Sequence, residues 1–188
     1  STTFETLTTT SSASKNYKKQ EGSYFDNYLK YTLDYDKRNK RFKPDDGFLN
    51  SFSQNVPLYS KNNEIRNSFE STKYQKFSNI VTRFSFYGAA INSLTGDDVR
   101  VSKRLHIPAR KLRGFEGGKV GPKENKDYIG GNYVSTLNFS ATLPKLLPSF
   151  QNTDISYFLD AANSWGIDYD STLDDKSTIR SATGIAVD

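Results

Sequence analysis

The stretch Lys111-Leu112-Arg113-Gly114-Phe115 lies inside a segment, residues 95–131, that shows neither strand alternation nor a helical period. Loops longer than about 12–15 residues are uncommon in compact domains unless they are functional or disordered. This segment does not have a disordered composition, because it carries apolar side chains along its length, at Val99, Val101, Leu105, Ile107, Leu112, Phe115, Val120 and Ile129. The sequence therefore predicts a long, ordered loop whose tip is an Arg-Gly-aromatic turn.

On both sides of this loop the sequence alternates with a period of two, as a strand with two different faces does. Between residues 29 and 36, Leu and Tyr occupy one face, and Lys, Thr and Asp occupy the other. No segment shows a sustained helical period, so the chain is predicted to be all-β. Further strands are expected at residues 132–143, 154–165 and 179–187, and less clearly near 2–14 and at 47–58, 64–77 and 79–94.

The connections between these strands differ in length in a regular way. The link at residues 77–80 is tight, and the link at 37–46 ends in Pro44-Asp45-Asp46-Gly47, which is favourable turn chemistry. The links on the opposite side include the long loop and the Asp- and Gly-rich residues 166–176. Short turns on one side and long loops on the other are typical of outer-membrane barrels. Pro144 and Pro148 are predicted to mark a strand exit on the short side.

The composition leaves a soluble β-sandwich and a membrane barrel open. Hydrophobic residues make up 35% of the chain and aromatic residues 14%. A sandwich core is usually rich in Val, Ile and Leu, whereas the apolar faces here are interrupted by Thr, Ser and Ala. The polar faces carry Asn, Ser and Thr, which suit a wet lumen, so the pattern favours the membrane barrel. With no Met, and with an alternating run at its end, the chain is predicted to be a piece of a longer protein.

Several classes of function are not expected. The absence of Cys excludes disulfides and thiolate metal sites. The net charge of +5 is spread among 21 acidic residues without a basic stripe, so nucleic-acid binding is not predicted. The single His and the Asp97-Asp98 and Asp174-Asp175 pairs lack the partners or spacing of a catalytic or metal site. The sequence therefore predicts no catalytic residue, no metal and no cofactor.

A set of short motifs adds to the strand pattern. A strand ends in Tyr-Asp before a Pro-x-x-Gly turn, and the long loop carries its Arg-Gly-aromatic tip followed by Gly-Pro. A Gly-Gly-Asn step opens the next strand, and the strand after that has an acid five residues before a Trp. The motifs are Tyr35-Asp36, Pro44 to Gly47, Leu112-Arg113-Gly114-Phe115, Gly121-Pro122, Gly130-Gly131-Asn132, and Asp160 with Trp165. Over most of the chain this combination resembles the C-terminal barrel of BamA-type outer-membrane protein assembly factors, of the bacterial surface antigen superfamily.

The resemblance implies a fold and a function. The fold would be a partial antiparallel transmembrane β-barrel, about eight strands of about sixteen, with one long inward-folding loop. Residues 1–188 would be a fragment of the barrel domain, with the POTRA domains and the first and last strands outside it. The function implied is folding and insertion of β-barrel proteins into the outer membrane of a Gram-negative bacterium, without enzymatic activity. The implied partners are the lipid bilayer, unfolded outer-membrane proteins and accessory lipoproteins.

Two alternatives stay open at this stage. One is a translocation-and-assembly or two-partner secretion transporter of the same superfamily, which shares the Arg-Gly-aromatic loop. The other is a passive porin-like barrel, which would conduct ions steadily and leave the assembly of other barrels unaffected. The number of POTRA domains upstream would separate the first of these from an assembly factor.

The resemblance also implies that the loop arginine, Arg113, reaches into the barrel and pairs with acids on its inner wall. The matching positions are Asp160 and Asn138, so this chain has one carboxylate and one amide where the family has two acids. By alternation both side chains fall on the polar faces of their strands. Arg113 is predicted to bind Asp160 bidentately. Gly114 would permit the turn, and Phe115 is predicted to anchor the tip in apolar surroundings.

Overall fold

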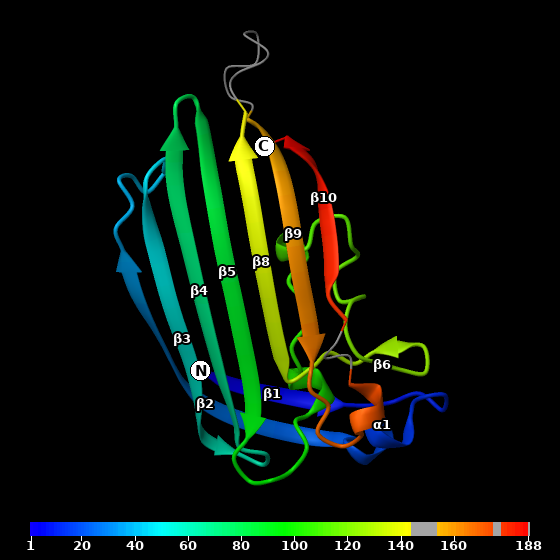
Figure 1. Ribbon diagram of the computed structural model, residues 1–188. Helices are drawn as coiled ribbons and strands as arrows, with labels where there is room; N and C mark the ends of the chain where they lie inside the picture. The colour runs from blue at the N-terminus through cyan, green and yellow to red at the C-terminus, as the bar shows by residue number, and fades with distance from the viewer. Residues whose placement is uncertain (144–153, 175–177, 188) are drawn as a thin grey trace.

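The computed structural model describes residues 1–143, 154–174 and 178–187, so the predicted strand exit at Pro144 and Pro148 lies outside the described residues. Eight strands form one antiparallel sheet in the order β1-β2-β3-β4-β5-β8-β9-β10 (Figure 1). The predicted all-β class and antiparallel arrangement are confirmed. The strands are β1 (Thr2–Leu7), β2 (Gly22–Asp36), β3 (Gly47–Ser60), β4 (Glu64–Phe77), β5 (Ile80–Ser93), β8 (Tyr133–Thr142), β9 (Ile155–Trp165) and β10 (Arg180–Val187).

The predicted and observed strands differ mainly near the N-terminus. The Thr-rich strand expected near residues 2–14 ends at Leu7, and the chain then turns into a short helix, α1 (Lys15–Lys19), that the sequence did not predict. Ser14 caps this helix by accepting a hydrogen bond from the Tyr17 N–H, and basic side chains occupy its last turn. Both features favour a helix even in so short a segment. β2 begins at Gly22, seven residues before the expected start at Leu29.

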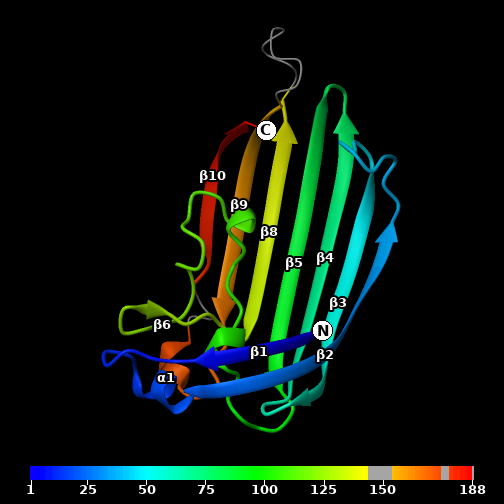
Figure 2. The same ribbon diagram turned by 180° about the vertical axis from the view of Figure 1, so that it is seen from behind.

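The two ends of the sheet carry different connections. The β2–β3 and β4–β5 links lie at the end drawn at the top of Figure 1, which we call the turn end. The long β5–β8 loop begins and ends at the opposite end, which we call the loop end. The prediction that the 37–46 and 77–80 links lie on the same side is therefore confirmed. Seen from behind, the long loop lies against one face of the curved sheet, in front of β8 and β9 (Figure 2).

A bulge on β3 changes the direction of the β2–β3 pair. Asn27 pairs with Tyr59 and the next residue, Tyr28, pairs with Pro57, so Leu58 of β3 is the extra residue. Bulges bend the strand that carries them, and proline within a sheet is confined largely to edges and bulges. The first half of β2 and the adjoining β1 accordingly sweep across the loop end, beneath the other strands (Figures 1 and 2). The sheet is thus curved into part of a barrel wall, which we describe by its concave face and its convex face.

The two faces have the reverse of the polarity of a soluble sandwich. The convex face exposes large apolar side chains, with Leu29, Tyr31, Leu33 and Tyr35 of β2 between 38% and 63% exposed. Other exposed residues of this face are Phe84, Leu137, Tyr157, Leu159 and Ile185. The concave face, which the loop covers, buries polar side chains: Asp26, Thr72, Ser85, Thr136, Asn138, Ser156 and Asp160. Among the described residues, no helix has the length and apolar character to cross a bilayer.

The long loop is ordered and packed, as its apolar side chains predict. It contains two 3-10 turns, Val101–Lys103 and Ala109–Lys111, and a small hairpin of β6 (Lys123–Glu124) and β7 (Asp127–Tyr128). Its apolar side chains and those of the wall form one buried cluster: Val99, Leu105, Ile107, Leu112 and Val120 from the loop, with Ala89, Ile91, Val134 and Ala162 from β5, β8 and β9. The hydrophobic core therefore lies between the loop and the sheet, and it fixes where the loop tip can sit.

Candidate functional site

The tip of the long loop rests on the concave face of β8 and β9. Leu112 is 2% exposed and belongs to the buried cluster, so it fixes the residue before Arg113 against the wall. Gly114 follows with φ +82°, a left-handed conformation that glycine adopts without the strain of a side chain. A Cβ at Gly114 would meet only the Ala182 side chain, at 3.9 Å, so backbone conformation and not lack of space is the reason for glycine here.

Arg113 and Asp160 form a bidentate ion pair. The guanidinium Nε donates to Oδ2 and Nη2 donates to Oδ1, each at 2.7 Å, and the Arg113 main-chain N–H donates to Oδ2 at 3.0 Å. The guanidinium also lies over the Phe158 ring, 3.9 Å from its centroid. Asp160 is fully buried, whereas 30% of the Arg113 side chain is exposed. The carboxylate is therefore the member of the pair that depends most on its partner, because it has lost its contact with water.

Asn138 is part of the same contact, but in a different way from the one predicted. Its amide nitrogen donates to Asp160 Oδ1 at 2.8 Å and to the Lys111 main-chain oxygen at 2.7 Å. Asn138 therefore contacts the loop, as the resemblance implied, but through the Lys111 main chain and Asp160 and not through the Arg113 guanidinium. The amide of Asn138 can donate a hydrogen bond to the Asp160 carboxylate. An ionised acid in its place could only accept one. Asn138 thus supports Asp160 and binds the loop main chain.

Phe115, predicted to anchor the loop tip, is less buried than Leu112. Phe115 is 36% exposed, and the buried apolar side chain of the motif is Leu112. Phe115 lines a small depression together with Ile107 and Leu112 at the surface of the loop.

A second ion pair near the tip was not predicted. Lys111, which is 5% exposed, donates from Nζ to Glu70 Oε1 of β4 at 2.7 Å and lies over the Tyr87 ring of β5. The sequence held one usable signal, since Glu70 falls on the polar face of the strand predicted at residues 64–77. Nothing in the sequence linked that position to a lysine 41 residues away.

The Gly-Gly-Asn step brings the base of the loop close to the wall. Gly131 and Leu105 exchange two main-chain hydrogen bonds, of 2.8 and 2.9 Å. A Cβ on Gly131 would overlap the main chain of Trp165, and a Cβ on Gly130, which has φ +71°, would lie 2.8 Å from the Leu105 carbonyl oxygen. Both glycines are therefore required for the close approach of three main-chain segments.

Asn132 completes this step with its side chain. Its Oδ1 accepts from Arg104 Nη1 at 2.8 Å, and its Nδ2 donates to Asp168 at 3.2 Å. Arg104 also pairs directly with Asp168, which follows β9. Burial of the Asp168 carboxyl opposes its ionisation, but hydrogen bonds from the Val99 N–H and from Arg104 outweigh that effect and hold its pKa below 3.8. Asn132 and Asp168 thus bind Arg104 of the loop together. The Gly-Gly-Asn motif indicated the position of Asn132 but not that of Asp168.

The remaining predicted motif, at the turn end, is structural and lies apart from the loop tip. Asp36 accepts hydrogen bonds from the main chain and guanidinium of Arg38. Gly47 has φ +94°, and a Cβ there would overlap the Lys37 carbonyl oxygen. Pro44 follows Lys43, which itself adopts a positive φ of 43°. The motif therefore closes the β2–β3 link. In the parts of the chain that the structure describes, no group of three or more His, Cys, Asp or Glu side chains is arranged to hold a metal.

Comparison with known proteins identifies the class of this partial barrel. Residues 2–188 match the Omp85 superfamily domain, and the chain belongs to that superfamily. Among solved structures it is similar to BamA from Haemophilus ducreyi lacking POTRA domains 1–3, with a TM-score of 0.79 and 22% sequence identity. The match covers 89% of this chain and 37% of the BamA chain, so the chain spans little more than a third of that structure. No curated protein matches the chain. The resemblance to a BamA-type barrel is therefore confirmed.

Proposed function

We propose that residues 1–188 are part of the C-terminal barrel domain of an outer-membrane protein assembly factor, with POTRA domains and the first and last barrel strands elsewhere in the full protein. In this proposal the full protein folds other β-barrel proteins and inserts them into the bacterial outer membrane, without enzymatic chemistry. Its partners are the outer-membrane bilayer, unfolded outer-membrane proteins and accessory lipoproteins. Membership of the Omp85 superfamily supports the class of function.

The observation that carries the membrane part of this proposal is the reversed polarity of the two faces. Large exposed apolar patches on a protein mark surfaces that are covered in the working state. Here such side chains occur along β2, β5, β8, β9 and β10, and all of them point away from the loop. A bilayer would cover this convex face, because lipid-facing and lumen-facing residues alternate along the strands of membrane barrels.

Polar side chains on the convex face are also consistent with a membrane environment. Tyr31 donates its hydroxyl to Gln54 at 2.6 Å, and Gln54 donates its amide to Asn67 at 2.5 Å. The three residues are cross-strand neighbours on β2, β3 and β4. Polar groups in hydrocarbon are costly unless they bind one another. This chain of hydrogen bonds reduces that cost.

The loop supports an assembly role over a porin role. A porin conducts through an open lumen, whereas this loop is packed against the concave face by a buried apolar cluster and by the Arg113–Asp160 pair. The transporter alternative of the same superfamily shares this arrangement, so the experiment must separate the two.

The test is to deplete the full protein in its own host and to measure the folded fraction of several unrelated outer-membrane barrels by their heat-dependent gel mobility. The proposal expects all of them to fall together and to recover when the wild-type gene is restored. Loss of a single exported protein, with normal assembly of the other barrels, would identify a transporter. Normal assembly together with steady single-channel conductance of the purified protein would identify a porin.

A further inference from the structure

A second part of the long loop also binds the wall through buried arginines. This part, residues 99–104, is the base of the loop, and we call it the crossbar. It buries two arginines, Arg100 at 2% and Arg104 at 4% exposure, together with Val99 at 0%. Arginine is almost never fully buried unless it is paired. The crossbar therefore has a specific set of partners on the wall.

Arg100 binds the strands at the beginning of the sheet. Its Nη2 donates to Asp26 Oδ2 of β2 at 2.6 Å and lies 3.4 Å from Glu64 Oε2 of β4. Its main-chain N–H donates to Glu64 Oε1 at 2.9 Å, and its guanidinium lies over the Tyr24 ring at 4.4 Å. Glu5 of β1 is 3.6 Å from Nη1. Both main acids, Asp26 and Glu64, are almost completely buried.

Arg104, at the other end of the crossbar, binds residues that flank the far strands. It contacts Asn132, which immediately precedes β8, and Asp168, which follows β9. Its guanidinium lies 5.1 Å from the centroid of the Tyr169 ring. Val99 adds a main-chain hydrogen bond to Asp168 at 2.8 Å. β2 and β9 are separated in the sheet by β3, β4, β5 and β8, so the crossbar joins two parts of the wall that share no ladder of hydrogen bonds.

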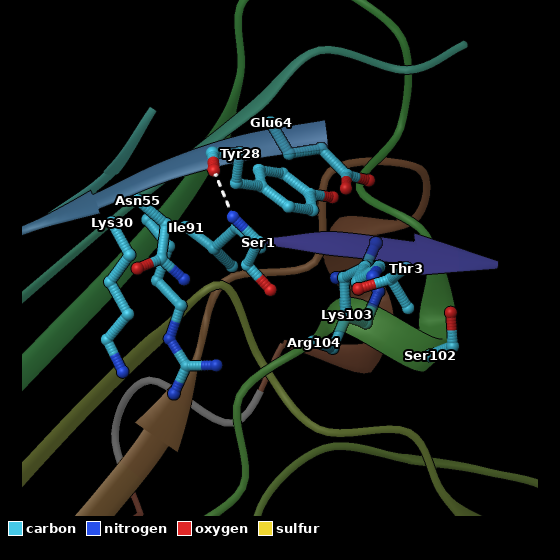
Figure 3. A pocket seen from close by; sticks show the side chains of 11 residues that line it. Ser1, Thr3, Tyr28, Lys30, Asn55, Glu64, Ile91, Ser102, Lys103 and Arg104 are labelled. Atoms are coloured by element: carbon cyan, nitrogen blue, oxygen red, sulfur yellow. Dashed lines mark hydrogen bonds between the residues drawn. The ribbon is translucent and has the colours of Figure 1, made fainter. Parts of the chain in front are cut away.

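The crossbar borders a cavity of about 330 Å³ on the concave face. Figure 3 shows Tyr28 and Glu64 on the wall side of this cavity, and Ser102, Lys103 and Arg104 on the loop segment facing them. Lys103 also reaches the wall, since its Nζ lies 3.2 Å from Asp26. The wall and the crossbar thus meet around the cavity mainly through charged side chains, while Val99 of the crossbar belongs to the apolar cluster that continues along the loop.

Those apolar contacts connect the crossbar to the tip. Val99, Leu105, Ile107 and Leu112 belong to one buried cluster, and Leu112 immediately precedes Arg113. Packed cores are dense and transmit displacement. We propose that Arg100 and Arg104 are positioning residues that hold the base of the loop between separated parts of the wall and thereby place Arg113 on Asp160. This inference concerns the loop and holds independently of the proposed function.

The experiment measures tip docking directly. The chain has no Cys. A Cβ on Gly114 would lie 3.9 Å from the Ala182 Cβ, within the usual range for a disulfide. The parent protein for every comparison would carry Gly114→Cys and Ala182→Cys, with any cysteine outside residues 1–188 replaced by serine. The strain of a side chain at the left-handed Gly114 is then the same in all variants. The disulfide-linked fraction would be counted only among barrels that show the folded, heat-modifiable gel band, so that loss of folding does not enter the result.

We expect Arg100→Gln and Arg104→Gln each to lower the linked fraction of folded barrels several-fold. The matched control is Arg110→Gln in the same loop, because Arg110 is exposed and forms no ion pair among the described residues. This control should leave the linked fraction unchanged. Arg100→Lys should give an intermediate value, since an ammonium can still meet Asp26. If Arg100→Gln does not fold, the linked fraction of Arg100→Lys takes its place in the test. An unchanged linked fraction in both Arg100→Lys and Arg104→Gln would overturn the proposal.

Discussion

Arg113 binds Asp160 with both its side chain and its main chain. One carboxylate therefore fixes the orientation of the Arg113 side chain and the distance of the loop main chain from β9. Three donors from a single residue occupy the two carboxylate oxygens, and Asn138 supplies a fourth. A buried carboxylate with this many donors is stabilised in its ionised form. The tip therefore has one well-defined docking position.

Removing the arginine should destabilise the folded barrel. Arg113→Gln removes the guanidinium and two of the four donors to the buried Asp160 carboxylate. A hydrogen bond to a charged group contributes about 1.5–3 kcal/mol. We expect a lower urea or temperature midpoint for loss of the folded gel band. The double variant Arg113→Gln with Asp160→Asn should recover part of the loss, because no charge is then left without a partner. A double variant that is less stable than Arg113→Gln alone would contradict this account.

Restoring the second acid of the family pattern should also destabilise this chain. Asn138→Asp replaces the donor to Asp160 by a second carboxylate and removes the donor to the Lys111 oxygen. Two ionised carboxylates at this distance repel each other. The thermal midpoint of the folded band should fall at neutral pH, relative to Asn138→Gln, which retains an amide. An increase in the midpoint would mean that Arg113 moves to a position between the two acids.

The Gly-Gly step should tolerate no side chain at its second position. A methyl group at Gly131 would overlap the main chain of Trp165 and force apart the Leu105–Gly131 bridge. Strain of this kind costs at least about 1–3 kcal/mol. Gly131→Ala should therefore reduce the folded fraction much more than Gly96→Ala. At Gly96 the added methyl meets no atom within 4 Å, and the cost is that of its positive φ alone. Equal folded fractions would show that the main chains can separate freely.

Acid should weaken the contact between the loop base and the wall. The pKa of Asp168 is lower in the folded protein than its ordinary value of 3.8. Its contribution to stability is therefore complete above that value and is lost as the pH falls through 3.8 toward the lower, folded pKa. Asp168→Asn should be less stable than the wild type at pH 7, and this difference should shrink between pH 5 and pH 3. A difference that stays constant across this range would exclude a role for the Asp168 charge.

The convex face should reject charge at its centre. Leu159, near the middle of β9, is 49% exposed on that face. An arginine at the midplane of a membrane barrel costs about 2–4 kcal/mol. Leu159→Arg should lower the amount of folded, membrane-extracted protein strongly. Ser68→Arg, whose side chain shares the concave face with Glu64 and Glu70, serves as the control and should be tolerated far better. Equal losses would argue against a lipid-facing convex surface.

Sequence periodicity was sufficient for most of the wall. Alternation predicted the bounds of β4, β5, β8 and β9 to within one residue, because side chains on the two sides of each strand differ in character over most of its length. It failed at the start of β2, where Tyr24, Asp26 and Tyr28 share the concave face. When aromatic and acidic residues share one face, the sequence does not alternate between apolar and polar residues, so the strand is not predicted. The face is mixed because it binds the crossbar.

The sequence predicted only part of the candidate site, because some of its contacts join residues with no local pattern to connect them. The positions of Arg113 and Asp160 followed from the motif order, and the face of Asp160 followed from alternation. The partners of Arg100 lie 74 and 36 residues away in sequence, and the loop has no period that would pair them. Their association depends on the curvature that the bulge near Pro57 introduces. Local patterns carry no information about such a contact.

The two anchored parts of the loop have a consequence for its length. Twelve residues lie between Arg100 and Arg113, and several of them belong to the buried cluster, so adding or deleting a residue there would move one arginine away from its acid. The return limb differs, because residues 114–119 are mostly exposed. Homologues that vary in loop length should therefore vary after the Arg-Gly pair and not before it.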